Sequence, residues 1–208
     1  NLNWDTKRDG TLYTMYKGDL MITLTRETKE TNITLSINKR NSESMINTPY
    51  PFLNHMLVAF SFYANLTLNI DATGDTDVDD HHLVEDIGIV LGQALLQYKQ
   101  TLTNIKRFGF FYMPMDESLS RVVVDFSNRP TLMYDVQFKN ERIANVTLDN
   151  FKEFFKALTN EARITLHITN LYGENDHHKI ESIFKGFGKC VYLALQEVDM
   201  LQSTKGVL

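Results

Sequence analysis

Two copies of one pentapeptide constrain this chain more than any other feature. The pattern His-His-x-x-Glu occurs at residues 81–85 and again at 177–181, and the two copies use four of the six histidines. Each copy stands at the start of an apolar run with helical spacing. On a helix, the glutamate shares a face with the histidines three and four positions before it. Because imidazole and carboxylate ligands together suit Mn, Fe or Zn, the sequence predicts a duplicated metal-site signature on a duplicated scaffold.

The composition excludes several classes of protein. With 208 residues, of which 43% are hydrophobic and 23% charged, the chain is typical of a globular protein with a sizeable core. A net charge of −5 gives no general attraction to nucleic acid or to an anionic membrane. Cys190 is the only cysteine, which excludes an internal disulfide, and we expect it to be a buried, inert thiol. Since no long apolar run or signal-peptide layout is present, we expect a cytoplasmic protein without nucleic-acid or membrane partners.

The hydrophobic pattern divides the chain into an extension and two similar halves. Residues 1–20 are polar, show no sustained period, and are expected to form an N-terminal extension with at most a short strand. Alternating apolar residues predict strands, and longer periodic runs predict helices. In the first half, 21–104, strands are expected at 22–24, 33–37 and 66–70, and helices at 51–64 and 82–99, with an acidic loop at 71–80. In the second half, 105–208, strands are expected at 121–126, 131–138 and 164–168, and helices at 148–162 and 178–198.

This order of elements predicts the fold class. Each half is expected to have the order β-β-α-β-α, with one apolar sheet face and two helices to cover it. Two such halves pack as an α/β (α+β) sandwich with internal duplication, in which sheets lie against helices. Because each half needs the other to bury its apolar surface, we expect one compact duplicated domain.

The two remaining histidines fall near the same elements. His55 lies on the helix expected at 51–64, and His167 lies on the last expected strand, on the face opposite Leu166 and Ile168. A single histidine is more often structural. Because all six histidines of the chain fall in or near the two motif copies, we expect them to be metal ligands. The count fits two sites of three histidines and one glutamate each, with positions open for substrate or water. The duplication is imperfect, because Asn69 stands where the first half would match His167.

Other charged residues near the motifs suggest supporting roles. The acidic run that begins at Asp75 does not fit a calcium loop, since its sixth position is Asp80 where that loop needs glycine. Asp79, Asp80 and Asp86 are expected to orient imidazole N–H groups, whereas Asp75 is expected to be a solvated turn residue. Basic residues and a glycine-containing segment could hold an anion if they converge, namely Arg107, Arg129, Lys185 and residues 203–206.

Taken in order, these motifs resemble one family, imidazoleglycerol-phosphate dehydratase, over residues 21–208. The resemblance is carried by the segments 26–31, 52–57, 74–86, 114–117, 129–130, 166–168, 173–185 and 203–206. It implies a di-manganese enzyme of histidine biosynthesis that converts imidazole glycerol phosphate to imidazole acetol phosphate and water through a metal-bound imidazolate. It also implies a large homo-oligomer, typically of 24 subunits, with active sites between subunits.

The resemblance also assigns roles to individual residues. Glu30 is implied as the general base, and its alternative role is a turn carboxylate paired with Lys29 or Arg26. The implied ligands of two Mn²⁺ ions are His55, His81, His82, Glu85, His167, His177, His178 and Glu181. We expect one ion to be held by His55, His82, Glu85 and one histidine of the second pair. The implied phosphate-binding residues are Arg107, Arg129, Lys185, Ser203 and Lys205.

The sequence departs from the family pattern at several positions, and two other functions use similar ligands. The helix that carries His55 departs from the family at Asn54, Val58, Ala59 and Tyr63, and Asn128 replaces a common glycine. One alternative is a dinuclear hydrolase or oxygen-activating oxidase, but four-helix di-iron proteins use the reverse motif, Glu-x-x-His, and lack strands. A second alternative is a non-catalytic scaffold whose metal ions only stabilise an oligomer.

Overall fold

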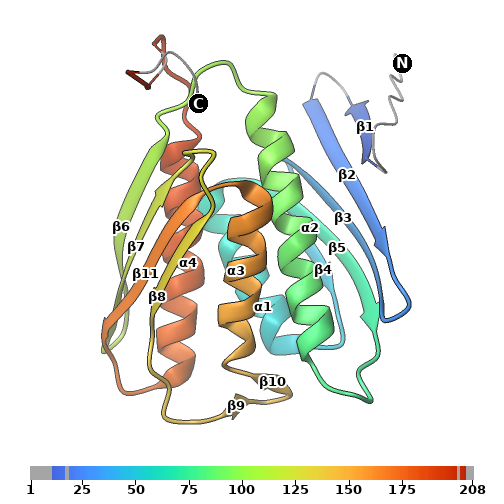
Figure 1. The fold of residues 1–208 in the computed structure, drawn as a ribbon, viewed down its shortest axis with the longest axis vertical. Helices are drawn as coiled ribbons and strands as arrows, with labels where there is room; N and C mark the ends of the chain where they lie inside the picture. Colours follow the sequence, from blue (N-terminus) through green and yellow to red (C-terminus); the bar gives the residue numbers. More distant parts are fainter. Residues whose placement is uncertain (1–10, 17–18, 201, 205–208) are drawn as a thin grey trace.

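A computed structural model of the chain describes residues 11–16, 19–200 and 202–204. Two sheets enclose four helices, so the molecule has sheets outside and helices inside (Figure 1). None of the helices in these ranges is long and apolar enough to span a membrane. The elements of the first half are β1 (Thr11–Tyr16), β2 (Asp19–Glu27), β3 (Thr31–Lys39), β4 (Met45–Asn47), α1 (Pro51–Ala64), β5 (Leu66–Gly74) and α2 (His81–Gln100). Those of the second half are β6 (Phe108–Met115), β7 (Ser118–Asp125), β8 (Thr131–Asp135), β9 (Arg142–Ile143), β10 (Val146–Thr147), α3 (Asn150–Ala162), β11 (Thr165–Tyr172) and α4 (Asp176–Ala194).

The strand orders of the two main sheets repeat. The first sheet has the order β1-β2-β3-β5-β4, and the second has the order β6-β7-β11-β8. Each sheet contains an antiparallel hairpin, β2–β3 or β6–β7. The second strand of the hairpin pairs with a later antiparallel strand, β5 or β11, which pairs on its other edge with a short parallel strand, β4 or β8. The predicted duplicated α/β sandwich is therefore confirmed. β1 pairs with β2, so part of the expected N-terminal extension forms an edge strand.

One long strand of the second sheet was missing from the sequence prediction. The expected pair 121–126 and 131–138 corresponds to β7 and β8, which do not pair with each other but lie on either side of β11. The hairpin partner of β7 is β6, which the prediction omitted. In β6 the outward residues Phe108, Phe110 and Tyr112 are as apolar as the inward Phe111 and Met113. Because polarity does not alternate, the usual signal of a half-buried strand is absent.

The helix boundaries follow local capping signals. α1 begins at Pro51, a residue suited to the first helical turn, and ends before Asn65 in the left-handed conformation. Its bounds agree with the prediction. α4 begins after Asn175, whose side chain accepts a hydrogen bond from the backbone N–H of His177. Both motif copies consequently lie in the first turns of their helices, α2 and α4.

The helices pack as two pairs, α1 on α4 and α2 on α3, with α1 and α2 against the first sheet and α3 and α4 against the second. Glycines allow the closest approaches: a Cβ at Gly88 would lie 2.5 Å from the carbonyl oxygen of Phe154, and one at Gly188 would lie 2.4 Å from that of Phe60. Cys190 is fully buried, and burial raises the pKa of its thiol to about 12. The expected inert thiol is thus a core residue.

The closest approach gives a stability prediction. A Cβ at Gly109 would lie 2.1 Å from the backbone carbonyl oxygen of Cys190, so Gly109→Ala must separate β6 from α4. We expect the variant to lose about 3 kcal/mol of unfolding free energy in chemical denaturation, as in other overpacked cores. Gly186→Ala is the matched control on α4, because its Cβ would meet the Val122 side chain at 3.1 Å, which can yield. Equal losses in the two variants would contradict this explanation.

Candidate metal centre

Both histidine pairs lie at the same end of the helical layer (Figure 1). α1 and α4 run in the same direction, since Phe52 contacts His177 near their starts and Phe60 stacks on Phe187 further along. In the other helix pair, His81 Nδ1 lies 3.2 Å from Asn150 Oδ1 at the start of α3. The first turns of the helices therefore bring the motif residues to one edge of the molecule.

The first histidine of each pair points toward the glutamate of its own motif. His81 Nε2 lies 3.2 Å from Glu85 Oε2, and His177 Nε2 lies 3.1 Å from Glu181 Oε2. Each contact joins residues four apart on a helix. The two motif copies thus present a nitrogen and a carboxylate oxygen side by side in the same arrangement.

The second histidine of each pair binds a carboxylate from a loop. His82 Nδ1 lies 3.0 Å from Asp75 Oδ2, and His178 Nδ1 lies 2.7 Å from Glu117 Oε2. The hydrogen bond that Asp75 accepts from His82 is the main cause that raises the pKa of His82. An ionised carboxylate only accepts hydrogen bonds, so each histidine donates through Nδ1 and keeps Nε2 for another ligand.

These carboxylates differ from the ones that the sequence suggested. Asp80 is buried and accepts hydrogen bonds from the backbone N–H and the hydroxyl of Thr147. Burial alone would raise the pKa of Asp80, but the Thr147 hydrogen bonds outweigh it and the pKa is lowered. Asp86 binds Arg26 and Thr31, and Asp79 caps the backbone N–H of His81. The predicted orienting roles of Asp79, Asp80 and Asp86 were wrong, as was the solvated role of Asp75.

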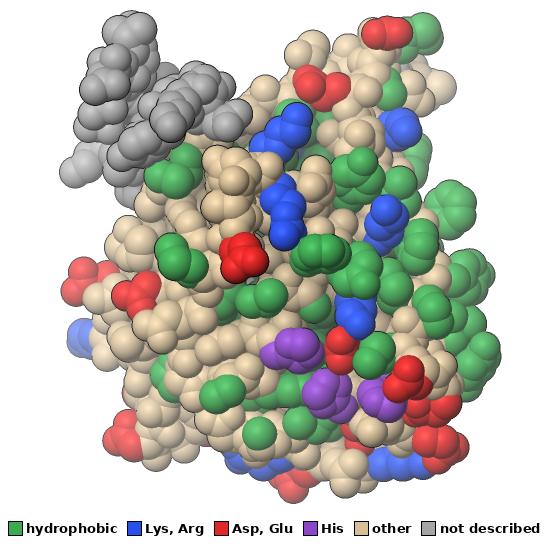
Figure 2. Space-filling view, turned by 180° about the vertical axis from the view of Figure 1, so that it is seen from behind, with side chains coloured by type: hydrophobic (Ala, Val, Ile, Leu, Met, Phe, Trp, Pro, Cys, Tyr) green, Lys and Arg blue, Asp and Glu red, His purple; other side chains and the backbone are tan. Residues whose placement is uncertain are grey.

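His55 joins the second motif. Its Nε2 lies 3.7 Å from Glu181 Oε2, and its ring centroid lies 5.9 Å from that of His177. Lys185 Nζ lies 2.7 Å from Glu181 Oε1. Burial would raise the pKa of Glu181, but Lys185 and the two histidines lower it, so the group stays ionised. Figure 2 shows histidines gathered on one face beside acidic and basic side chains.

Two groups of possible metal ligands lie close together among the described residues. One is His55, His177 and Glu181, and the other is Glu30, Asp75 and His82; in each, the ligand atoms lie within 4.8 Å of one another. Within one chain, His55 is thus grouped with the second motif, and the expected grouping with His82 and Glu85 is not formed. Nitrogen and carboxylate donors fit manganese, iron or zinc, as expected for both groups.

His167 lies apart from these groups. It is exposed on the face of β11 that points away from the helices, between Val123 of β7 and Met133 of β8. The expected alternation of β11 is confirmed, since Leu166 and Ile168 are buried in the core. A single chain does not bring His167 to either motif.

Of the candidate phosphate-binding residues, Lys185 lies beside Glu181, whereas Arg107 and Arg129 gather elsewhere. Arg107 binds Asp125 through Nε and Nη2, at 2.7 and 3.1 Å, and Arg129 Nη2 lies 3.7 Å from the same carboxylate. Asp125 is the main cause that raises the pKa of Arg107. Arg107 Nη1 also donates to the carbonyl oxygen of Gln202, next to Ser203. Lys205 lies outside the described residues.

These arginines lie far from the motif histidines of the same chain. The backbone N–H of Arg107 donates to the carbonyl oxygen of Ala194, at the end of α4 opposite His177. With 19 residues in α4, a rise of about 1.5 Å per residue separates the two ends by roughly 25 Å. A small molecule much shorter than this distance therefore cannot reach both sets of residues in one chain.

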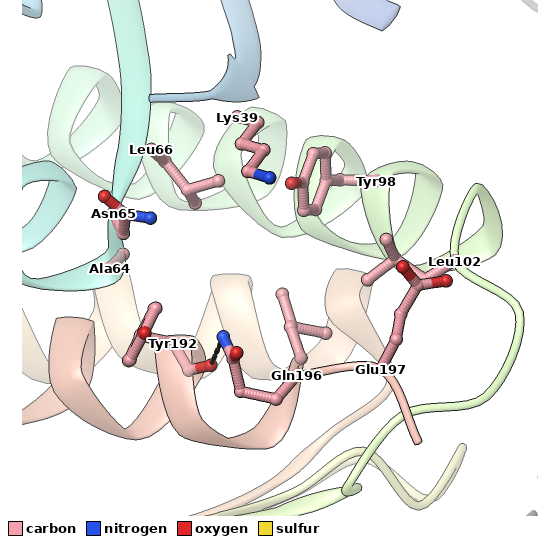
Figure 3. Close-up of a pocket in the computed structure, with 10 residues that line it drawn as sticks. Lys39, Ala64, Asn65, Leu66, Tyr98, Leu102, Tyr192, Gln196 and Glu197 are labelled. Atoms are coloured by element: carbon pink, nitrogen blue, oxygen red, sulfur yellow. Dashed lines mark hydrogen bonds between the residues drawn. The ribbon is translucent and has the colours of Figure 1, made fainter. Parts of the chain in front are cut away.

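A cavity at the far end of the helices contains none of the motif residues. It has a volume of about 270 Å³ and is lined by residues that include Lys39, Asn65, Tyr98, Tyr192 and Glu197 (Figure 3). Tyr98 and Tyr192 belong to the last turns of α2 and α4. The motif histidines begin these same helices, so the cavity and the candidate metal centre lie at opposite ends.

Fold and site together define an α/β protein with a duplicated histidine and carboxylate centre. The family model of imidazoleglycerol-phosphate dehydratase matches residues 48–191. An imidazoleglycerol-phosphate dehydratase of Staphylococcus aureus (strain JH9) is 46% identical over 185 residues, which cover 88% of this chain and 96% of that protein. The chain therefore belongs to the imidazoleglycerol-phosphate dehydratase family, as the motifs predicted, and is a dehydratase, an enzyme of the lyase class.

Solved structures agree with this assignment. The crystal structure of the Staphylococcus aureus N315 enzyme has a TM-score of 0.79 and 42% sequence identity, and the match covers 86% of this chain and 99% of that one. The Pyrococcus furiosus enzyme in complex with (S)-C348 has the same TM-score and identity, with 89% and 100% covered. The whole of each relative is thus represented in the fold described above.

Proposed function

We propose that this chain converts imidazole glycerol phosphate to imidazole acetol phosphate and water, as a step of histidine biosynthesis in the cytoplasm. The observation that carries the proposal is the matched geometry of the two motif copies. In each, an imidazole nitrogen lies within 3.2 Å of a carboxylate oxygen, and the second histidine is held through Nδ1. Such paired sites suit the two nitrogens of a substrate imidazole ring.

The donor set fits two Mn²⁺ ions per active site. Imidazole nitrogens and ionised carboxylates are the ligands that such ions take, and in each motif a nitrogen and a carboxylate oxygen already lie side by side. The residues that would hold the ions are His55, His81, His82, Glu85, His167, His177, His178 and Glu181. When bound, the ions would stabilise negative charge on the imidazole ring of the substrate.

Glu30 is proposed as the general base. Its side chain is 57% exposed, and its Oε2 lies 3.7 Å from His82 Nδ1, beside the first motif. Arg26 is engaged by Asp86, so the alternative of a turn carboxylate paired with Arg26 finds no support. Glu30 would take the proton from the side-chain carbon next to the ring, and the neighbouring hydroxyl would leave as water.

The substrate phosphate is proposed to bind a second copy of the chain. The proposed phosphate ligands are Arg107, Arg129, Lys185, Ser203 and Lys205. Arg107 and Arg129 lie at the far end of the helical layer, and Lys185 lies nearer the motif histidines. Because α4 separates Arg107 from His177, the phosphate and the imidazole of one substrate would be held by different subunits. A site shared between subunits thus explains why one chain keeps the two sets apart.

Self-association is also supported by the outer face of the second sheet. Phe110 is 67% exposed, Met133 is 57% exposed, and His167 lies on the same side of the sheet. Exposed apolar surface of this kind favours association with a protein partner. We propose a large homo-oligomer, of 24 subunits, in which this face and His167 meet another copy.

Turnover of imidazole glycerol phosphate by the manganese-loaded protein tests the proposed function. Formation of imidazole acetol phosphate supports it. A manganese-loaded protein without turnover would instead support a metal-assembled scaffold, and hydrolysis or oxygen consumption without dehydration would support the dinuclear hydrolase or oxidase.

A further inference from the structure

The internal duplication relates Glu30 to a second glutamate. In the first half, the pair Arg26–Ile33 joins β2 to β3, and in the second half Met113–Ser120 joins β6 to β7 with the same register. The two hairpins therefore correspond residue by residue. The strand that pairs next in each sheet has the same register, since Leu35 of β3 pairs with Ile70 of β5 and the equivalent Val122 of β7 pairs with Ile168 of β11. This register places Glu30 and Glu117 at equivalent positions, each directly before the second strand of its hairpin.

Glu117 is fixed by three hydrogen bonds. Its Oε1 accepts from the backbone N–H groups of Glu174 and Asn175, at 2.9 and 2.8 Å. Its Oε2 accepts from His178 Nδ1 at 2.7 Å. One carboxylate therefore joins the tip of the β6–β7 hairpin, the loop before α4 and the second histidine of the motif.

Glu30 is held by its backbone and not by its side chain. Its backbone N–H donates to the Thr28 hydroxyl, and its carbonyl oxygen accepts from the backbone N–H of Asp75. Its carboxylate lies 3.7 Å from His82 Nδ1, whereas Asp75 accepts a hydrogen bond from that nitrogen at 3.0 Å. The function that Glu117 performs in the second half thus falls to Asp75 in the first.

We propose that Glu117 is a positioning residue that holds His178 with its proton on Nδ1 and its Nε2 turned to a metal ion. The duplicated glutamates have then divided their roles. Glu117 orients a ligand, whereas Asp75 performs that task for His82 and leaves Glu30 available for proton transfer. This inference rests on the proposed function, because it requires the motif histidines to bind metal.

Manganese titration of the whole protein separates the two roles. The amide of Glu117→Gln has one acceptor oxygen and an NH₂ group, so it cannot accept from His178 and from both backbone N–H groups. We expect this variant to bind one of its ions about 10- to 100-fold more weakly, as when other carboxylates behind metal-bound histidines are lost. Because Glu30 is proposed as the general base and not as a ligand, and Glu30→Gln leaves the hydrogen bond of His82 to Asp75 in place, this variant should bind manganese as tightly as the wild type and yet fail in turnover. Free Mn²⁺, followed by electron paramagnetic resonance, gives the affinities without an activity assay.

Glu174→Gln is the matched control, since this exposed residue lies in the same loop and pairs with Lys139, not with His178. We expect wild-type manganese affinity for it. Wild-type affinity in Glu117→Gln would overturn the proposal while the proposed function stands, whereas a wild-type protein without metal or turnover would remove the function itself. If Glu117→Gln does not fold, Asp75→Asn provides the test, because Asp75 is proposed to orient His82. Weaker binding of the manganese ion held by His82 would support the divided roles, and unchanged binding would overturn them.

Discussion

Glu30→Gln is expected to lower kcat for dehydration by about 10²- to 10⁴-fold, the usual contribution of a general base. The amide has nearly the same shape as the carboxylate but cannot accept a proton. Because the Glu30 side chain is more than half exposed and makes no contact with Lys or Arg among the described ion pairs, the fold should not change. Steady-state kinetics of manganese-loaded wild type and variant measure the effect.

Glu27→Gln provides the control for this prediction. Glu27 lies on the same hairpin and is exposed, but no metal group includes it. Its substitution should leave kcat within about twofold of wild type, as for other surface changes. Undiminished activity in Glu30→Gln would exclude Glu30 as the base and direct attention to Asp75, the other carboxylate near His82.

Removal of metal is expected to dissociate the assembled protein. His167 lies on the outer face of β11, away from both motif copies of its own chain, so it could act as a metal ligand only for an ion held by another copy of the chain. Ions shared between subunits contribute their binding free energy to assembly. Sedimentation velocity before and after treatment with a chelator should therefore show a shift from a large particle to smaller species, together with loss of turnover.

Readdition of Mn²⁺ should restore both the large particle and the activity. Mg²⁺ at the same concentration should restore neither, because it favours oxygen ligands over imidazole. If elemental analysis shows that the metal is gone and the sedimentation profile is unchanged, the ions do not hold the subunits together.

The sequence predicted the elements whose signals are local. Pro51 at the start of α1 and the helical period that follows gave the helix its correct bounds. The motif copies were placed correctly in the first turns of α2 and α4, because the spacing of histidine and glutamate is itself helical. β6 was missed because both of its faces are apolar.

The partners of the histidines could not be predicted in the same way. Asp75 and Asp80 are close in the acidic segment, yet only Asp75 reaches an imidazole, while Asp80 binds Thr147 from the other half of the chain. Glu117 reaches His178 only because the β6–β7 hairpin meets the loop before α4. Its correspondence to Glu30 depends on the register of β6, the strand that the prediction omitted.

We propose that the two motif copies hold two ions around one substrate ring. Elemental analysis of purified protein, after dialysis against manganese, counts these ions. We expect two Mn²⁺ per chain in the wild type and one in Glu85→Gln or Glu181→Gln, since each glutamate contacts the histidine of one motif. A wild-type protein that retains one ion or none, or single variants that retain two, would contradict it.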